Sequence, residues 1–200
     1  MILLNSNAAH IFWLGRYLTR TQYLCSLFPF QDDEAARSYA HAFCLPAFDA
    51  GSLNELAADP QHPASFASQF QYAQNNILDL RGVLSARGYA ELNRLIRNAN
   101  ENSAYICDAA AECQEALEAE SEDIFLFFSL GQCIEDLDRQ LRLHQDESLT
   151  LQKINRIAAA LAHIGWGGLN DACQQLKAQP GSTQFYHFSD HIHTLFEAGA

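Results

Sequence analysis

Residues Ile11 to Arg20 read IFWLGRYLTR, and this stretch decides the fold. Its apolar side chains recur at helical spacing and cover nearly the whole circumference of the helix, which is typical of a buried, central element. Gly15 lies in the middle, where glycine costs a helix about 1 kcal/mol relative to alanine. A close crossing with a second helix would explain that glycine. The same helix carries Arg16 and Arg20, which lie on one face.

A second stretch, FFSLGQCIED from Phe127 to Asp136, matches the first when the two are aligned on their glycines. Gly131 then corresponds to Gly15, and apolar residues correspond on both sides of it. The match predicts two equivalent helices in an internally duplicated core. Coincidence stays open as the alternative, because any two core helices can share a Leu-Gly pair.

Two buried guanidinium groups require carboxylates or a bound anion nearby. The second stretch and the residues after it supply Glu135, Asp136 and Asp138. Three interpretations follow: a buried structural ion pair, arginines that stack on aromatic rings with their charged ends in water, or a ligand-binding or catalytic site. We expect the structural pair. Glu135 to Arg139 and Asp138 to Arg142 also have the i,i+4 spacing of ordinary surface pairs.

If the buried arginines form a ligand-binding or catalytic site, two sets of residues are candidates for it. Its catalytic candidates are Arg16, Arg20 and Glu135. Its candidates for substrate binding are Asn76, Asp138 and Arg142. No Ser-His-Asp or Cys-His arrangement is visible from spacing. The glycine-rich stretch from Gly165 to Asn170 lacks the lysine of a phosphate-binding loop, and we expect a turn with Trp166 packed inward.

The tail sequence YHFSDHIHTLF places His187, Asp190 and His191 on one helical face, with His193 nearby. Two histidines at i,i+4 and a carboxylate could hold a divalent metal if a further ligand or water completed the shell. No second cluster in the sequence supplies that ligand. A surface helix rich in histidine is the simpler interpretation, so the sequence predicts no metal and no other cofactor.

Helical spacing recurs along the rest of the chain, and no alternating strand pattern of convincing length appears. The sequence predicts an all-α fold, a bundle of about seven or eight helices with a possible internal duplication, in one domain over residues 1–200. Two antiparallel neighbours are expected: a helix that follows Pro63 and runs to Leu84, and a long helix from Tyr89 to Ala119. Other helices are expected over 6–28, 33–43, 122–144, 149–163 and within the tail. Breaks are expected at Pro29, 46–53, 59–63, 165–168 and Pro180-Gly181.

Composition limits the expected partners and the compartment. The net charge is −12, from 24 acidic and 12 basic residues, so nucleic acid and anionic membrane surfaces are not expected partners. The N-terminus has no basic region ahead of its apolar residues and does not resemble a signal peptide, and no apolar run is long enough to cross a bilayer. Six cysteines without a C-x-x-C pair are expected to be buried, reduced thiols in the cytoplasm.

An ordered set of motifs resembles the alpha-E domain family, which consists of predicted all-helical proteins with a Glu-Arg motif. Members carry a stretch like LGRYLERA twice, with D-P-x-x-P and a helix containing R-E-N in between. Here the counterparts are LGRYLTRT at 14–21, DPQHP at 59–63, QNN at 74–76, ELN at 91–93 and LGQCIEDLDRQLR at 130–142. They stand in the family's order and span the chain as far as Arg142.

The charged residues of the family motif are partly lost in this chain. The first Glu-Arg is replaced by Thr19-Arg20, the second by Glu135-Asp136, and R-E-N by QNN. One arginine and one glutamate survive, on opposite repeats. The resemblance is therefore to a short, divergent member.

Alpha-E proteins are associated with circularly permuted ATP-grasp proteins and transglutaminase-like proteins, in systems that form or modify amide bonds. The resemblance implies a non-catalytic accessory or scaffold protein whose partners are an ATP-grasp ligase-like protein and a transglutaminase-like protein. Two alternatives stay open: an enzyme of the same pathway that uses the buried arginine and glutamate, and a small metal-binding helical protein. Association of identical chains, as a homo-oligomer, stays open as well.

Overall fold

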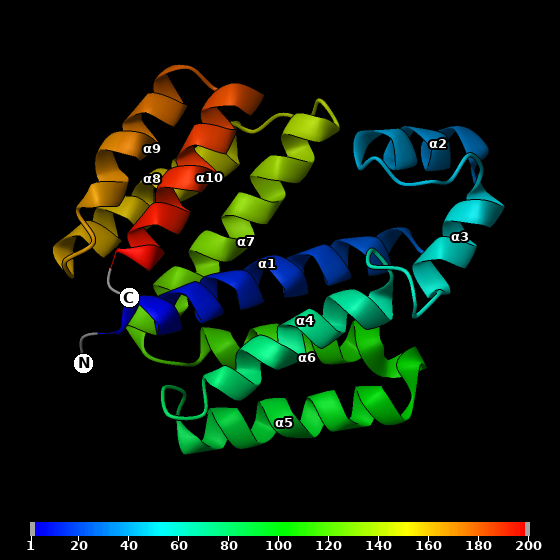
Figure 1. Cartoon of the computed structure of the whole chain (residues 1–200), viewed down its shortest axis with the longest axis horizontal. Coiled ribbons are helices and arrows are strands. Elements are labelled where there is room, and N and C mark those ends of the chain that lie inside the picture. Colours follow the sequence, from blue (N-terminus) through cyan, green and yellow to red (C-terminus); the bar gives the residue numbers. More distant parts are fainter. Residues whose placement is uncertain (1–2, 199–200) are drawn as a thin grey trace.

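The computed structural model describes residues 3–198, and within that range the chain is all-α, without a strand (Figure 1). This confirms the predicted fold class. Ten α-helices are present in the described range, so the expected count of seven or eight is too low. They are α1 (Asn5–Leu27), α2 (Asp33–Ala42), α3 (Ala50–Ala58), α4 (Phe66–Asp79), α5 (Ala86–Glu101), α6 (Ile106–Glu118), α7 (Glu122–Arg142), α8 (Ser148–His163), α9 (Gly168–Ala178) and α10 (Ser182–Glu197). None of these helices is both long and apolar enough to cross a membrane.

Helices α1 and α7 cross near the centre of the molecule, and they cross at the two glycines aligned in the sequence (Figure 1). A Cβ atom on Gly15 would overlap the carbonyl oxygen of Phe128, and one on Gly131 would overlap the carbonyl oxygen of Phe12. Each glycine therefore admits the backbone of the other helix. The close crossing predicted at Gly15 is confirmed.

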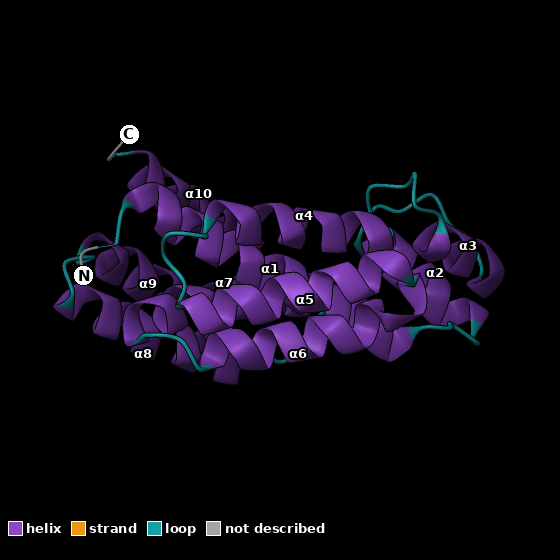
Figure 2. Ribbon diagram, turned by 90° about the horizontal axis from the view of Figure 1, so that it is seen from below, coloured by secondary structure: helices purple, strands orange, loops and turns teal. Residues whose placement is uncertain are grey.

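Three further helices are associated with each crossing helix. Helix α1 packs against α4 and α6, which α5 joins. Helix α7 packs against α8, which α9 joins to α10, and α10 packs against α1 as well as α7. Figures 1 and 2 show α8, α9 and α10 at one end of the molecule. Helices α2 and α3 lie at the opposite end, beside the C-terminal end of α1. They have no counterpart between α7 and α8.

The hydrophobic core has two parts. The larger part fills the crossing and both sets of helices, and it includes the fully buried Phe127. Trp166 packs its ring against Phe127 at a centroid distance of 4.8 Å, which confirms the inward-facing tryptophan expected in that turn. The smaller part, around Tyr39 and Leu53, attaches α2 and α3 to Leu24 on α1.

The long helix predicted from Tyr89 to Ala119 is wrong. The chain leaves helical conformation at Asn102, whose side chain accepts a hydrogen bond from the Ala104 amide at 3.1 Å. A short polar side chain that binds the local backbone competes with the helix in this way. The 3-10 turn η1 (Ser103–Tyr105) follows, and the chain continues as α6. Helix α5 packs mainly on α6, whereas α4, its expected partner, packs mainly on α1.

Helix α3 is unexpected, because the sequence predicts a break over residues 46–53. Its start is stabilised by a capping box: the Asp49 carboxylate accepts a hydrogen bond from the Ser52 amide at 2.7 Å, and the Asp49 amide donates to the Ser52 hydroxyl at 3.2 Å. Such a box satisfies backbone amides that the first turn leaves free. The Asp-x-x-Ser pattern was the signal that could have located this helix.

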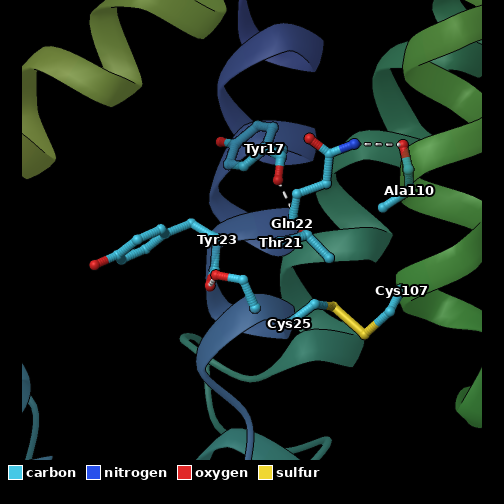
Figure 3. Close-up of a disulfide and its surroundings, with 8 residues drawn as sticks. Tyr17, Thr21, Gln22, Tyr23, Cys25, Cys107 and Ala110 are labelled. Carbon is cyan, nitrogen blue, oxygen red and sulfur yellow. Dashed lines mark hydrogen bonds between the residues drawn. A yellow bond between two sulfur atoms is a disulfide. The ribbon is translucent and has the colours of Figure 1, made fainter.

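A disulfide joins Cys25, at the end of α1, to Cys107, in the first turn of α6 (Figure 3). The two Cα atoms are 5.8 Å apart, and beside the bond Gln22 donates to the Ala110 carbonyl oxygen at 3.3 Å. The expectation of six reduced thiols is wrong for this pair. The two cysteines are 82 residues apart, so no local spacing in the sequence could predict their contact. Cys44 is exposed rather than buried. Burial is confirmed for the free thiols of Cys113, Cys133 and Cys173.

Gly131→Ala tests the crossing of α1 and α7. The new methyl group must displace the Phe12 backbone, so we expect the free energy of unfolding to fall by about 1–3 kcal/mol, as in other overpacked cores. Chemical denaturation followed by circular dichroism measures the change. Gly51→Ala in α3 is the matched control, because its Cβ would meet nothing closer than 3.6 Å. Equal effects of the two substitutions would contradict the tight crossing.

The disulfide predicts the number of free thiols. Titration of the denatured, unreduced protein should find four thiols rather than six. Because the bond closes a long loop, the Cys25→Ser/Cys107→Ser variant should lose about 2–5 kcal/mol of unfolding free energy. Reductant should lower the stability of the parent protein to that of the variant and leave the variant unchanged. Six thiols in the parent would show that the bond is absent.

Candidate functional site between α1 and α7

Arg16 and Arg20 on α1 both bind Glu135 on α7. The Arg16 Nε donates to Glu135 Oε2 at 3.0 Å, the Arg20 Nε donates to Oε1 at 2.5 Å, and the Arg20 Nη2 donates to Oε2 at 2.8 Å. Glu135 is only 4% exposed. The three catalytic candidates from the sequence are therefore brought together in one buried cluster, in which two arginines share a single carboxylate.

The charges of this cluster hold one another ionised. Burial by itself would raise the pKa of Glu135, but the charge and hydrogen bonds of Arg20, followed by those of Arg16, outweigh it and hold this pKa below its ordinary range. Burial would likewise lower the pKa of Arg20, and the charge of Glu135 reverses that effect. Glu135 is thus a carboxylate at neutral pH, and both of its oxygens accept hydrogen bonds from arginine.

Aromatic rings cover the two arginines. The Arg16 guanidinium lies over Trp13 at 4.9 Å from the ring centroid, and that of Arg20 lies over Tyr17 at 6.0 Å. The prediction that the arginines stack on aromatic rings is therefore confirmed. The prediction that their charged ends lie in water is wrong for Arg16, whose side chain is 10% exposed, whereas the side chain of Arg20 is 34% exposed.

Gln69 on α4 is a member of the cluster that sequence reasoning missed. Its Oε1 accepts a hydrogen bond from Arg20 Nη1 at 3.3 Å, and its Nε2 donates to the Pro63 carbonyl oxygen at 2.6 Å. It links the arginine to the DPQHP segment, for which the sequence predicted a break before the next helix and a likeness to the family's D-P-x-x-P. A signal existed, because Gln69 lies three residues after Phe66 and four before Ala73, on the apolar stripe of α4.

The acidic end of α7 forms further pairs. Arg142 Nε donates to Asp138 Oδ1 at 2.9 Å, as the i,i+4 spacing predicts. The predicted pair of Glu135 with Arg139 is wrong, because Glu135 turns toward α1 and Arg139 binds Asp136 at 3.0 Å instead. Arg142 also reaches other helices: it donates to a backbone carbonyl oxygen at the end of α2 at 3.2 Å and to a tyrosine hydroxyl of α10 at 3.3 Å.

A cavity of about 220 Å³ lies beside the buried cluster, between α1 and α7 and beneath α2 and α3. Its polar wall consists of Arg20, Glu135, Asp138, Arg139 and Arg142, together with Gln69 and Thr19. Apolar and aromatic side chains from α1, α2, α3 and the loops that follow α2 and α3 form the rest. Two of the three substrate-binding candidates, Asp138 and Arg142, therefore line this cavity.

The remaining candidate residues lie elsewhere. Asn76 does not line the cavity; its side chain contacts His10 Nδ1 at 3.1 Å and donates to the Tyr72 carbonyl oxygen at 2.8 Å. His191 uses its Nε2 in a hydrogen bond with the Gly168 carbonyl oxygen at 2.8 Å. His187 and Asp190 are exposed on α10. Between residues 3 and 198, no three His, Cys, Asp or Glu side chains are arranged to hold a metal ion, so the fold does not assemble the metal candidate.

Glu135→Gln tests the buried cluster. It leaves the Arg16 guanidinium buried without a counter-charge, so we expect a loss of about 3–5 kcal/mol of unfolding free energy at neutral pH. Because the folded pKa of Glu135 lies below its unfolded value of roughly 4.3, the stabilisation is fully present at pH values well above that unfolded value and is lost as the pH falls through the folded pKa. The difference between parent and variant should therefore shrink in acid. Denaturation at several pH values measures it.

Two further variants complete that experiment. Arg20→Ala should cost less than Glu135→Gln, because Arg16 still binds the carboxylate and water reaches part of the Arg20 site. Glu91→Gln removes an exposed ion pair with Arg94 and should have a much smaller effect than either. A variant at Glu135 as stable as the one at Glu91 would show that the buried cluster does not stabilise the fold.

Comparison with known proteins identifies the family of this chain. Residues 3–178 match the model of Alpha-E, described as a predicted alpha-helical domain with a conserved ER motif. No curated protein and no solved structure matches the chain. In the two stretches that resemble this motif, Arg20 is the surviving arginine of the first and Glu135 the surviving glutamate of the second, and the two bind each other. With 176 of its 200 residues matched, as counted from those bounds, the chain belongs to the Alpha-E family.

Proposed function

We propose that this protein is a non-catalytic accessory or scaffold protein of an ATP-grasp system that forms or modifies amide bonds. Its partners are an ATP-grasp ligase-like protein and a transglutaminase-like protein. Membership of the Alpha-E family supports the association. The observation that carries the non-catalytic role is the saturation of Glu135, whose two oxygens both accept hydrogen bonds from arginines.

A general acid or base works best when its pKa lies near the operating pH. The pKa of Glu135 is displaced away from neutral pH, because Arg20 and Arg16 hold it below the ordinary range of a carboxyl group. The side chain is also 4% exposed and makes its contacts with two cations of its own chain. These properties suit a residue that holds two helices together, and they favour the accessory role over the enzyme that uses this pair.

The arrangement of the helices supports a second part of the proposal, an internal duplication. Helix α1 with α4, α5 and α6 forms one half, and α7 with α8, α9 and α10 forms the other. The halves meet at the aligned glycines, Gly15 and Gly131, through reciprocal contacts. The hairpin of α2 and α3 is then an insertion into the first half.

Affinity capture from the native cell tests the accessory role. The tagged protein, isolated in mild salt, should retain an ATP-grasp ligase-like protein identified by mass spectrometry. The reconstituted pair should then show ligase turnover that depends on the presence of this protein. Recovery of no ligase-like partner would overturn the proposal.

One variant distinguishes the accessory role from the alternative that the protein is an enzyme. Glu135→Gln, assayed at a temperature where circular dichroism shows it folded, should support the partner's turnover as well as the parent does. Glu91→Gln serves as the control with an exposed glutamate replaced. Loss of turnover in the folded Glu135 variant alone would assign the glutamate to catalysis and contradict the accessory role.

A further inference from the structure

The cavity beside the buried cluster combines a charged wall with an apolar one. Arg20, Asp138 and Arg142 line one side, and their side chains are partly exposed, at 34%, 12% and 30%. The opposite side is formed by aromatic and aliphatic residues of α1, α2, α3 and the loop between them, namely Tyr23, Leu24, Tyr39, Phe43, Leu45 and Leu53. A ligand that complements both walls has one polar end and an apolar body.

The charged wall carries an excess of positive charge. Arg142 is paired with Asp138 and Arg139 with Asp136, which leaves Glu135 as the carboxylate for both Arg16 and Arg20. Three arginines and two carboxylates line the cavity, namely Arg20, Arg139, Arg142, Glu135 and Asp138, although the chain as a whole has a net charge of −12. The residual charge of one favours a monovalent anion at this place.

Arg20 has hydrogen-bond donors left for such an anion. Its Nη1 donates to Gln69 and its Nη2 to Glu135, and each of these nitrogens carries two hydrogens. One N–H of each therefore remains, on a side chain that lines the cavity. Two N–H donors that these bonds leave unused can serve the two oxygens of a carboxylate.

The volume limits the size of the ligand. About 220 Å³ lies below the roughly 300–1,000 Å³ of sites for drug-sized molecules. Such a space accommodates one group of the size of an amino-acid residue. The aromatic rings of Tyr39 and Phe43 and the side chain of Leu53 make the body of that group hydrophobic.

We propose that this cavity binds the α-carboxylate of a hydrophobic amino-acid residue, with the carboxylate on Arg20 and the side chain against Tyr39, Phe43 and Leu53. The carboxylate belongs either to a free amino acid or to the C-terminal residue of a peptide, since both present the same group. The site depends only on the geometry of the cavity, so it does not rest on the accessory role, and each proposal can fail without the other.

Titration followed by NMR tests the site on the full chain. The probes are N-acetyl-phenylalanine and its amide, which differ only in the charge of the carboxyl end. The acid should bind and shift resonances of residues around the cavity, and the amide should bind at least about tenfold more weakly, the loss expected for one charge-assisted hydrogen bond. Equal binding of the two, or no binding of the acid, would overturn the proposal.

Two further probes distinguish the sources of the carboxylate. Tighter binding of N-acetyl-Leu-Phe than of phenylalanine would identify a peptide C-terminus as the ligand. Tighter binding of phenylalanine would identify the free amino acid. Both results support the carboxylate site, provided that the amidated forms bind more weakly.

A cavity-filling variant controls for the position of binding without touching the buried ion pairs. Ala64 lines the cavity and is half-buried, so Ala64→Phe should fill it and weaken binding of the acid at least about tenfold. Ala67→Phe, on the same segment but away from the cavity, is the matched control and should bind as the parent does. Circular dichroism verifies that both variants fold. Unchanged affinity of folded Ala64→Phe would overturn the proposal.

Discussion

The sharing of Glu135 by Arg16 and Arg20 is the interaction on which the rest of the structure depends. A carboxylate buried to this extent is unfavourable unless cations and hydrogen bonds replace its water, and two guanidinium groups do so here. Helices α1 and α7 approach to backbone contact where they cross, and glycine at both crossing positions, Gly15 and Gly131, permits that approach. The charge cluster and the helix crossing therefore join the same two helices.

The two sides of the crossing differ in a way that the alignment of α1 and α7 makes visible. On one side Arg20 binds Glu135, and the two residues lie in the stretches that resemble the family's Glu-Arg motif. The aligned positions hold Thr19 and Asp136, which both line a second cavity of about 620 Å³, and Thr19 lines the first cavity as well. The Thr19 hydroxyl is buried there without a hydrogen-bond partner among the described residues. The crossing therefore has a charged pair on the side of Arg20 and no ion pair between Thr19 and Asp136, so the surplus positive charge lies on the side of Arg20.

Much of the candidate site was predictable from local sequence. The apolar surroundings of Arg16 and Arg20 required carboxylates or a bound anion. The aligned stretch and the residues after it offered Glu135, Asp136 and Asp138, of which Glu135 is the residue that binds both arginines. The contribution of Gln69 was missed, because one glutamine on an apolar stripe does not reveal its partner. Asn76 was assigned to the site through a family motif, and the fold directs it toward His10 instead.

By itself, the sequence determined the helical class, the central place of the two Leu-Gly helices and the need for a counter-charge, since all three follow from periodicity and from the cost of burying charge. Only the tertiary structure decided which chain segments meet. The reversal at Asn102, the disulfide between Cys25 and Cys107, and the cavity between α1, α7 and the hairpin of α2 and α3 belong to this second group. Each of these features depends on contacts between residues far apart in the chain, or on a choice among local hydrogen bonds of similar strength. A pattern of neighbouring residues contains no information on such long-range contacts or on such a choice.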